Sequence, residues 1–377
     1  MIYPNLTTVL GENIAGWEKG GVKMRSFDYT YLADRTWDNE ILSYISKIHE
    51  YKGKQDLFLR QKPVELNRLT EIAKIQSTEA SNRIEGIITT NSRLKQLVTD
   101  KTTPKNRNEE EILGYRNVLN LVHENYDMLP VRSSYILQMH RDLLKYTNYS
   151  YGGQFKTTPN EIDMLLENGA KVVLFKPLEP YETPDAINMI CESYQAALDR
   201  EVVDELILIP CFILDFLCVH PFNDGNGRMS RLLTLLLLYR SGYLVGQYIS
   251  IEKAIADTKE SYYDALQKAD LGWHDGKNDP KPFIKYMLGV ILSCYREFEK
   301  RVKIVNDSGT KSTSYDIVKA YALDKIGKFS KQEVLVGCPR LGSSSVESAL
   351  KKLVDDGTLI RIGAGRKTIY ARADSVR

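Results

Sequence analysis

The stretch His220-Pro-Phe-Asn-Asp-Gly-Asn-Gly-Arg-Met-Ser-Arg231 joins two apolar segments of this 377-residue chain. Residues 203–218 before it are almost wholly apolar, and the run from Leu232 to Tyr239 follows it. A helix that is apolar on all sides belongs at the centre of a bundle. The sequence therefore predicts two buried helices, connected by a polar segment that is rich in chemically active side chains.

The polar segment has the composition of a phosphate site. Gly225-Asn226-Gly227 can turn successive backbone N–H groups toward one point, and the helix that starts at Arg228 would direct its positive end there as well. Asp224 lies beside this point. It suits Mg²⁺, which takes one or two carboxylates together with phosphate oxygens and water.

Three further side chains of the segment fit chemistry on a phosphate. His220 has a pKa that lets it accept a proton at neutral pH. Arg228 and Arg231, one helical turn apart, can both reach toward a polyphosphate. Any one of these features alone would indicate an ordinary helix start with a structural histidine. Their combination in a dozen positions favours a functional site.

The segment resembles the core motif of the Fic family, H-P-F-x-[DE]-G-N-G-R-x-x-R, and matches it at every position. The resemblance implies a mainly α Fic helical bundle and a protein adenylyltransferase, which uses ATP and Mg²⁺ to place AMP on a protein Tyr, Ser or Thr hydroxyl, its own included. It implies that His220, Asp224 and Arg228 are catalytic and that Asp224 holds the metal. It also assigns nucleotide contacts within the motif to Phe222, Asn223, Gly225, Asn226, Gly227 and Arg231.

A second segment, Ser81-Asn-Arg-Ile-Glu85-Gly86, resembles the inhibitory helix of the same family, [ST]-x-x-x-E-[GN]. Ser81 and Glu85 are one helical turn apart, and Gly86 is a natural helix stop. The resemblance implies that Ser81, Glu85 and Gly86 are inhibitory residues. In it Glu85 pairs with Arg231 inside the nucleotide site and keeps that arginine from the terminal phosphate. The alternative is a surface helix with a capping serine.

A third segment, Lys259-Glu-Ser-Tyr-Tyr263, bears on nucleotide recognition. Similar family members carry Arg at the position of Lys259 and often Asn at that of Asp270, and they place the first tyrosine, here Tyr262, against the base. The resemblance thus implies that Tyr262 and Asp270 contact the nucleotide. Lys lacks a planar guanidinium and Asp lacks an amide donor, so the adenine contacts stay open. We expect Tyr263 to pack in the core.

Residues 161–177 predict a β-hairpin, because Lys171-Val-Val-Leu-Phe175 has strand composition and Pro177 closes it. The hairpin resembles the flap over a Fic active site, which binds the target segment by strand addition. We expect flap contacts at Ile162, Leu165 and Val173. A plain connecting hairpin is the alternative.

Apolar periodicity and polar breaks predict three domains. Residues 1–125 form an N-terminal helical region with the inhibitory helix, whose first 40 residues or so read as an irregular arm. The resemblance implies that residues 126–305 form the Fic catalytic core and that His140 is structural in it. A linker-like stretch over residues 306–313 precedes a small domain over 314–377.

The small domain has the pattern of a winged helix, with three short helices followed by two strands. Residues 311–377 hold 13 Lys and Arg against 7 Asp and Glu, an excess of six positive charges. This fits a DNA-binding face, with Ser343 to Ser345 opening the recognition helix and Arg366 and Lys367 in the wing. Winged helices also bind proteins, so either ligand is open.

Composition limits the remaining possibilities. The formal charge of +2 leaves no field for polyanions over the whole molecule. Five scattered cysteines indicate free thiols in a reducing cytoplasm, and no zinc site. No apolar run is long enough for a bilayer, and the N-terminus lacks signal-peptide features. We expect a cytoplasmic protein with no membrane partner, and a homodimer is left open.

Two alternative functions are kept. One is a DNA-binding regulator whose core senses nucleotide. The other is a hydrolase in which Glu85 orients water to remove AMP from a modified protein. Other family members transfer UMP, phosphate or phosphocholine; Asp224 in the complete motif favours AMP.

Overall fold

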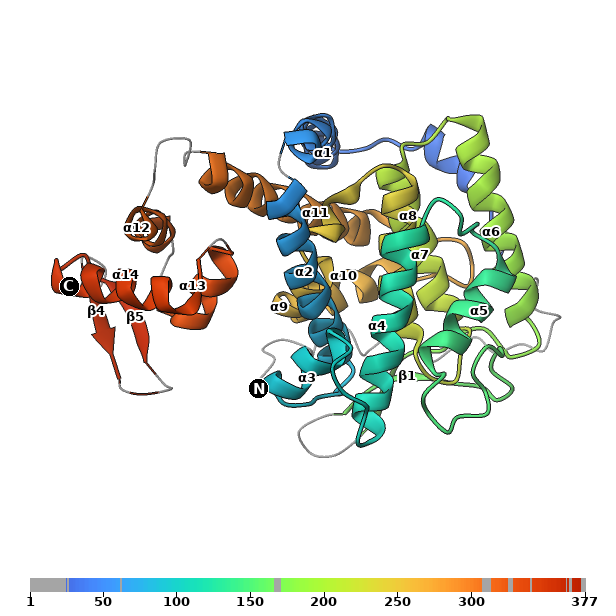
Figure 1. Ribbon diagram of the computed structural model, residues 1–377. Helices are drawn as coiled ribbons and strands as arrows, with labels where there is room; N and C mark the ends of the chain where they lie inside the picture. Colours follow the sequence, from blue (N-terminus) through green and yellow to red (C-terminus); the bar gives the residue numbers. More distant parts are fainter. Residues whose placement is uncertain are drawn as a thin grey trace.

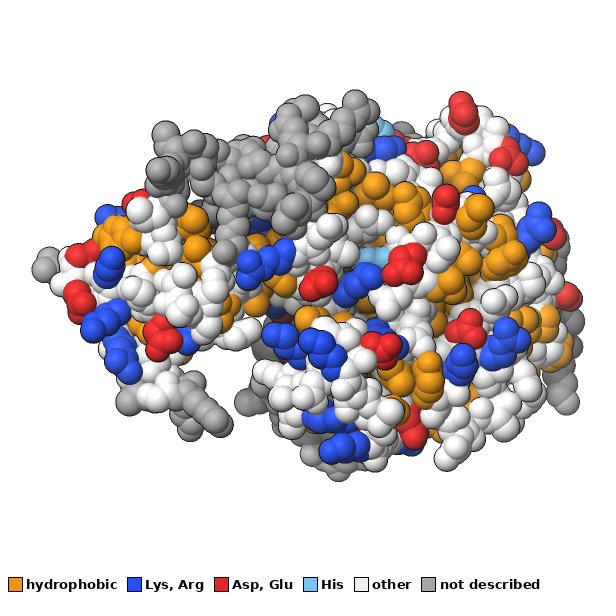
Figure 2. Space-filling model, in the orientation of Figure 1, with side chains coloured by type: hydrophobic (Ala, Val, Ile, Leu, Met, Phe, Trp, Pro, Cys, Tyr) orange, Lys and Arg blue, Asp and Glu red, His pale blue; other side chains and the backbone are white. Residues whose placement is uncertain are grey.

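The computed structural model describes residue 25 and residues 27–61, 63–165, 171–306, 313–324, 328–339, 341–363, 365 and 368–373. It is mainly helical, as predicted, and its strands form two small sheets (Figure 1). Positive and negative side chains are mixed over the face shown in Figure 2. None of the described helices combines the length and apolar character needed to cross a membrane. The five cysteines are all buried and unpaired.

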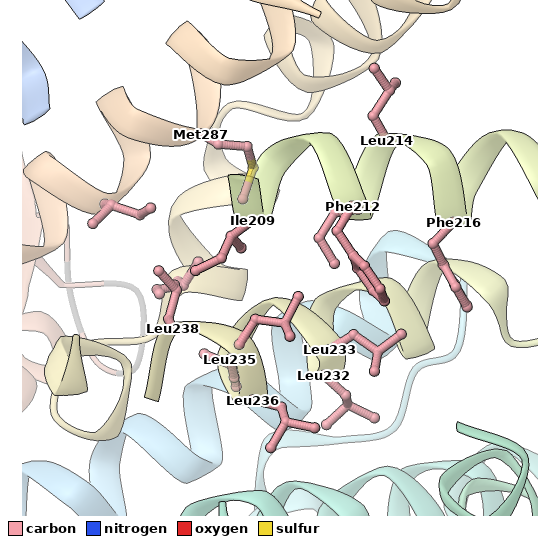
Figure 3. Close-up of a cluster of buried hydrophobic side chains, with 14 of the residues drawn as sticks. Ile209, Phe212, Leu214, Phe216, Leu232, Leu233, Leu235, Leu236, Leu238 and Met287 are labelled. Carbon is pink, nitrogen blue, oxygen red and sulfur yellow. The ribbon is translucent and has the colours of Figure 1, made fainter. Parts of the chain in front are cut away.

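Helices α7 (Glu205–Val219) and α8 (Asn226–Arg240) lie at the centre and confirm the two predicted buried helices. Figure 3 shows their buried side chains, which are Ile209, Phe212 and Phe216 of α7 and Leu232, Leu233, Leu235, Leu236 and Leu238 of α8. Burial of each such side chain stabilises the fold by about 1.5–3 kcal/mol. The loop between the two helices is thereby anchored at both ends.

The other helices surround this pair. Helices α6 (Thr183–Arg200) and α11 (Lys281–Asn306) pack on α7, and α4 (Arg107–Asn125) packs on α8. Helix α2 (Pro63–Ile84) contacts α4, α8 and α9 (Ile251–Asp257), so its C-terminal end comes close to the α7–α8 loop. The outer positions are taken by α1 (Asn39–Gln61), α3 (Asn91–Val98), α5 (Ser133–Leu143), the 3-10 turn η2 (Leu244–Gln247) and α10 (Lys259–Asp270).

Residues 27–34 differ from the expected irregular arm. They contain the 3-10 turn η1 (Tyr29–Asp34), in which Tyr29 and Leu32 are buried. The Tyr29 hydroxyl donates to Asp215 Oδ2 of α7 at 2.9 Å. A single 3-10 turn is too short to produce a helical pattern in the sequence, which is why it was missed. Residues 1–24 and 26 of the predicted arm lie outside the described residues.

A two-stranded antiparallel sheet precedes α6. Strand β1 (Ile162–Leu165) pairs with β2 (Lys171–Phe175), with Ile162 opposite Phe175 and Leu165 opposite Lys171. The Phe175 ring at the end of β2 stacks on His274 at 5.3 Å, which ties the base of the hairpin to the segment after α10. The connecting residues 166–170 lie outside the described residues.

The elements after α11 have a hydrophobic cluster of their own, with Val318, Val334, Leu350 and Leu353 fully buried in it. They are α12 (Ser314–Asp324), β3 (Phe329–Ser330), α13 (Lys331–Gly337), α14 (Ser343–Asp355), β4 (Leu359–Ile362) and β5 (Ile369–Arg372). The strands form one antiparallel sheet in the order β3-β5-β4. Strand β3 was not expected, because two residues carry no alternation pattern. Arg366, Lys367 and residues 307–312 of the predicted linker lie outside the described residues.

Candidate active site

The loop between α7 and α8 is shaped by two left-handed residues. His220 ends α7 with φ 50° and ψ 62°, and Gly225 precedes α8 with φ 86°. Between them the Asn226 side chain accepts from the Phe222 N–H at 2.9 Å and donates to the Phe222 carbonyl at 2.7 Å. The Asn226 side chain therefore closes the loop, so that only its backbone N–H is available to a ligand.

The start of α8 leaves amide groups free for an anion. The N–H groups of Asn226, Gly227 and Arg228 have no intrahelical partner at the first turn of a helix. The Gly225 N–H already donates to Asp224 Oδ1 at 2.6 Å. The helix dipole adds a partial positive charge at this end. The predicted phosphate site thus has its donors at the beginning of α8.

Glu85 lies directly against this helix end. It follows the last residue of α2, and Gly86 behind it has φ 77°. A Cβ atom on Gly227 would lie 2.2 Å from Glu85 Oε1, so a side chain there is incompatible with this position of the carboxylate. Gly227 thus serves close approach of an acidic group, rather than an unusual backbone angle.

Arg231 is held by the end of α2. Its Nε donates to Ser81 Oγ at 2.8 Å, and its Nη2 donates to the Ser81 carbonyl at 2.9 Å and to Glu85 Oε1 at 2.7 Å. Ser81 and Arg231 are both buried. The structure therefore brings Ser81, Glu85 and Arg231 together, as the resemblance implied.

The pKa of Glu85 is lowered in this position. Burial alone would raise the pKa, but the charge of Arg231 and its hydrogen bond, with smaller contributions from Arg228 and Lys259, outweigh burial. Glu85 is therefore an ionised carboxylate at neutral pH. It occupies a place suited to an anion.

Arg228 has a buried partner that the sequence did not reveal. Its Nη1 lies 2.7 Å from Glu111 Oε2 of α4, and both side chains are at least 98% buried. Its Nη2 lies 3.4 Å from Asp224 Oδ1. A signal for Glu111 was present, because Glu111, Tyr115, Val118 and Val122 share one buried helical face. An acidic residue on such a face indicates a buried partner.

His220 is held in one tautomer. Its Nδ1 lies 3.2 Å from the Leu217 carbonyl, so Nδ1 carries the proton and donates, and Nε2 keeps a free lone pair. Burial lowers the pKa of His220 to about 4. The imidazole is therefore neutral at pH 7 and can accept a proton at Nε2.

His140 of α5 contacts the motif, which also contains Phe222 and Asn223. The Phe222 ring is fully buried and stacks on His140 at 3.7 Å, so only its backbone can reach a ligand. His140 accepts from the Gly153 N–H at Nδ1, and its Nε2 donates to the Asp224 carbonyl at 3.0 Å. These contacts fit the expected structural role of His140. Asn223 is exposed in the loop.

The tyrosine pair is arranged differently from our expectation. Tyr262 is buried against Phe283 and Tyr286, close enough to Arg231 and Glu85 for their charges to act on the pKa of its phenol, which burial raises. Tyr263 is 45% exposed, so the prediction that it packs in the core is wrong. Tyr262, Ala265 and Ala269 are the buried face of α10, and Tyr263 is turned about 100° from it.

Lys259 and Asp270 lie at opposite ends of α10. Lys259 Nζ donates to the Ile84 carbonyl at 2.9 Å, so this lysine contacts the end of α2. Asp270 is half-buried, and burial raises its pKa to about 7. Among the described residues, no hydrogen bond or ion pair connects the Asp270 carboxyl to the 220–231 segment.

Of the expected hairpin contacts, Val173 is 42% exposed and Ile162 is half-buried. Leu165 belongs to β1, and its side chain lies outside the described part of the structure. Of the two expected contacts whose side chains are described, Val173 is thus the accessible one.

Comparison with known proteins finds a family match in the central region. Residues 130–238 match the Fic/DOC family. The "Protein adenylyltransferase Fic" of Culex quinquefasciatus is 26% identical over 59% of this chain and 41% of its own length. "Protein adenylyltransferase fic-1" of Caenorhabditis elegans is 26% identical over 48% of this chain and 32% of its own length. The chain thus spans less than half of the length of these curated relatives.

Solved structures share the fold. A Fic family protein from Desulfovibrio desulfuricans G20 superposes with a TM-score of 0.58 at 19% identity, over 90% of this chain and 97% of that one. A Fic domain containing signaling protein from Bacteroides thetaiotaomicron gives a TM-score of 0.56 at 23% identity, over 70% of this chain and 98% of that one. The His220–Arg231 site therefore lies within the region that matches the Fic/DOC family, and the chain is similar to protein adenylyltransferases at low identity.

Proposed function

We propose that the chain is a protein adenylyltransferase restrained by its own Glu85. The observation that carries the proposal is the Glu85 carboxylate at the start of α8, 2.7 Å from Arg231. An acidic side chain held there supports an anion site that a nucleotide phosphate can also occupy. The names of the curated relatives support transfer of AMP from ATP.

In this function the start of α8 binds the phosphates of ATP. The N–H groups of Asn226, Gly227 and Arg228 donate to phosphate oxygens. Arg228, held by Glu111 at 2.7 Å, presents fixed positive charge without needing to reorganise. Arg231 binds the terminal phosphates once it is released from Glu85.

His220 then acts as the general base. Its Nε2 takes the proton of a Tyr, Ser or Thr hydroxyl, and the hydroxyl oxygen attacks the α-phosphorus. The bond between that phosphorus and the oxygen bridging to the β-phosphate breaks, and pyrophosphate leaves with the electron pair. The products are the AMP ester and a protonated His220. A base with a pKa of about 4 is unprotonated but weak at pH 7, so positioning and electrostatics supply most of the acceleration.

Asp224 is the residue that would hold Mg²⁺. Its side chain is 39% exposed beside the phosphate-binding amides, and Mg²⁺ takes one or two carboxylates with phosphate oxygens. Among the described residues, no three or more His, Cys, Asp or Glu side chains are grouped so that they could hold a metal ion. In this proposal the phosphate oxygens supply the remaining ligands. When bound, Mg²⁺ would neutralise charge on the phosphates.

The hairpin β1–β2 is proposed as the element that holds the target. Its accessible side chains, including Val173, suit addition of an extended target segment as a further strand. The target hydroxyl would then be presented to His220.

We also propose that the chain has three domains, which are the N-terminal region 1–125, the core 126–305 and a winged-helix domain over residues 314–377. The winged-helix domain is proposed to bind DNA. The supporting observation is the exposed side of α14, where Ser344, Ser348 and Lys352 follow at four-residue spacing. Lys351 is exposed as well. The adjacent exposed side chains of Lys351 and Lys352 suit contact with phosphates, while Glu347 and Asp355 balance their charge within the helix.

The test of the main proposal is intact-mass measurement of the full chain with ATP and Mg²⁺, alone and with the Glu85→Gly variant. A mass gain of one AMP supports transfer. Bound ATP without any gain, on the chain or on an added cell extract, favours a nucleotide sensor. Release of AMP from previously modified protein, lost in Glu85→Gly, favours the hydrolase.

A further inference from the structure

Two residues outside the motif, Lys156 and Asn160, make several hydrogen bonds to the loop between α7 and α8. Lys156 and Asn160 lie between α5 and β1, in the segment that leads into the hairpin. Lys156 is 2% exposed although it carries an ammonium group. A buried lysine is costly unless its charge is well solvated by the protein, so its partners are informative.

These partners are the backbone carbonyls of the loop. Lys156 Nζ donates to the Val219 carbonyl at 3.0 Å, and Lys156 N–H donates to the Pro221 carbonyl at 2.8 Å. Asn160 Nδ2 donates to the carbonyls of His220 at 3.2 Å and Phe222 at 3.0 Å. Four consecutive carbonyls, from residue 219 to residue 222, thus accept from two residues.

The two side chains are also joined to each other. Lys156 Nζ donates to Asn160 Oδ1 at 2.8 Å, which fixes the amide orientation and turns Nδ2 toward the loop. The positive charge lies at the C-terminal end of α7, where unpaired helix carbonyls favour a cation. One hydrogen-bonded unit therefore both ends α7 and holds the residues after it.

The unit holds an unfavourable conformation. His220 is a non-glycine residue with φ 50°, and the left-handed region is unfavourable for an L-residue because its Cβ atom crowds the backbone. The carbonyls on both sides of the His220 α-carbon, those of Val219 and His220, are each fixed by the unit. The direction of the imidazole depends on this backbone.

We propose that Lys156 and Asn160 are positioning residues for His220, which hold its left-handed backbone so that Nε2 faces the start of α8. The inference rests on the proposed role of His220 as the general base. It also connects the hairpin to the catalytic loop, because Asn160 is two residues before β1.

The charge of Lys156 also acts on the pKa of His220, separately from the hydrogen bonds to the loop. Burial lowers the pKa of His220 most, and the hydrogen bond to the Leu217 carbonyl raises it. Of the charged groups, Lys156 of this unit lowers the pKa, and Glu85 and Asp224 raise it. Lys156 in turn faces Glu179 and Glu182, while burial lowers its own pKa to about 8. Removal of the lysine charge should raise the pKa of His220.

The experiment uses the full chain carrying Glu85→Gly and compares Asn160→Asp and Lys156→Met with Asn148→Asp and Lys145→Met. The control residues are exposed and lie in the same connection. Asn160→Asp keeps the shape and the acceptor for Lys156 but loses the donor to the loop. We expect kcat for AMP transfer to fall about 10- to 100-fold with the KM for ATP unchanged, because misplacement of a reacting group has effects of this size.

NMR of the His220 imidazole gives a readout that does not need activity. Its signals, assigned by their loss in His220→Ala, should move in both test variants and in neither control, and its pKa should rise in Lys156→Met. Unchanged His220 signals would overturn the inference, even if the rate fell. Labelling that persists in His220→Ala would instead contradict the proposed base, and the NMR comparison would still test whether Lys156 and Asn160 position His220.

Discussion

At the scale of single residues, His220 combines a fixed tautomer with a low pKa. The Leu217 carbonyl holds the proton on Nδ1, and burial keeps the ring neutral well below pH 7. Nucleotide binding, in contrast, depends on the amides of α8 and on the two arginines. Proton transfer and binding are therefore assigned to separate groups and can be separated by mutation.

His220→Ala should abolish AMP incorporation and leave ATP binding intact. Loss of a general base typically lowers the rate by about 10²- to 10⁴-fold. Intact mass measures the first effect, and ATP titration the second. His49→Ala, on α1, is the control. Labelling by His220→Ala at the parent rate would contradict the assignment.

Glu85→Gly should free Arg231 and raise self-labelling. A coupling of this kind is worth about 1–3 kcal/mol, or roughly 5- to 150-fold. Arg231→Ala should cancel the gain, and the two changes should be non-additive because they act on one ion pair. Labelling rates of the parent, both single variants and the double variant measure the coupling, with Glu79→Ala on the exposed side of α2 as control. An unchanged or lower rate in Glu85→Gly would mean that Glu85 does not restrain transfer.

The restraint should weaken in acid. The pKa of Glu85 is lowered below 4.5 when it is paired with Arg231, so the pairing stabilises the restrained state above this pH and is lost as the pH falls through the lowered pKa. The ratio of the Glu85→Gly rate to the parent rate should therefore stay constant from pH 7 to about pH 5 and fall below pH 4.5. Glu85 itself raises the pKa of His220, so the His220 titration is measured in both chains and divided out of the ratio. A constant ratio would show that Glu85 ionisation is not involved.

At the scale of elements, α2 is fixed by its neighbours as well as by Arg231. Ser77 Oγ donates to the buried Glu252 of α9 at 2.7 Å, one turn before Ser81. Lys259 Nζ of α10 donates to the last carbonyl of the helix, that of Ile84. Helix α10 also carries Tyr262, which is close to Arg231. The end of α2 and the predicted base-contacting helix are thus in direct contact.

Lys259→Met should loosen the end of α2 and raise self-labelling, by less than Glu85→Gly does. The methionine keeps the aliphatic stem but cannot cap the Ile84 carbonyl. Hydrogen exchange at residues 82–86 should increase in parallel. Lys268→Met on the exposed side of α10 is the matched control. Faster exchange without faster labelling would show that the cap does not affect transfer.

The elements that the sequence predicted are those with long runs or long periodic patterns of apolar residues. The apolar segments of α7 and α8 were legible because burial on all sides leaves few polar positions. The motif between them was legible from its own residues. The turn η1 and the strand β3 were missed because a few residues have no period. Glu111 was missed as a partner of Arg228 because ion pairing between distant helices is decided by packing, although its position on a buried face was readable.

At the scale of the whole molecule, the two proposed functions belong to regions with separate hydrophobic clusters. The larger one contains α7 and α8, and the smaller one contains α12 to α14. The positive excess of residues 311–377 belongs with the smaller cluster, whereas the rest of the chain is slightly acidic. Any contact with a polyanion should therefore be local.

The full chain should bind duplex DNA at low salt, with an affinity that falls steeply as salt rises, because phosphate contacts release counterions. Replacement of Lys351 and Lys352 by Glu should abolish the complex in a mobility-shift assay. Replacement of Lys95 and Lys101, near α3, by Glu is the control for net charge. No complex at low salt would favour a protein ligand for this region.

The Gly227–Glu85 contact has a consequence for how the proposed enzyme would respond to its own abundance. The competitor for the phosphate site is part of the same chain, so its effective concentration is set by the fold, on the order of millimolar or more for tethered groups. Dilution cannot relieve such a restraint, and a second copy is not needed to impose it. The fraction of unrestrained molecules at a given pH should therefore be constant across protein concentrations and should respond to nucleotide. A self-labelling rate per molecule that depends on dilution would place part of the control between chains.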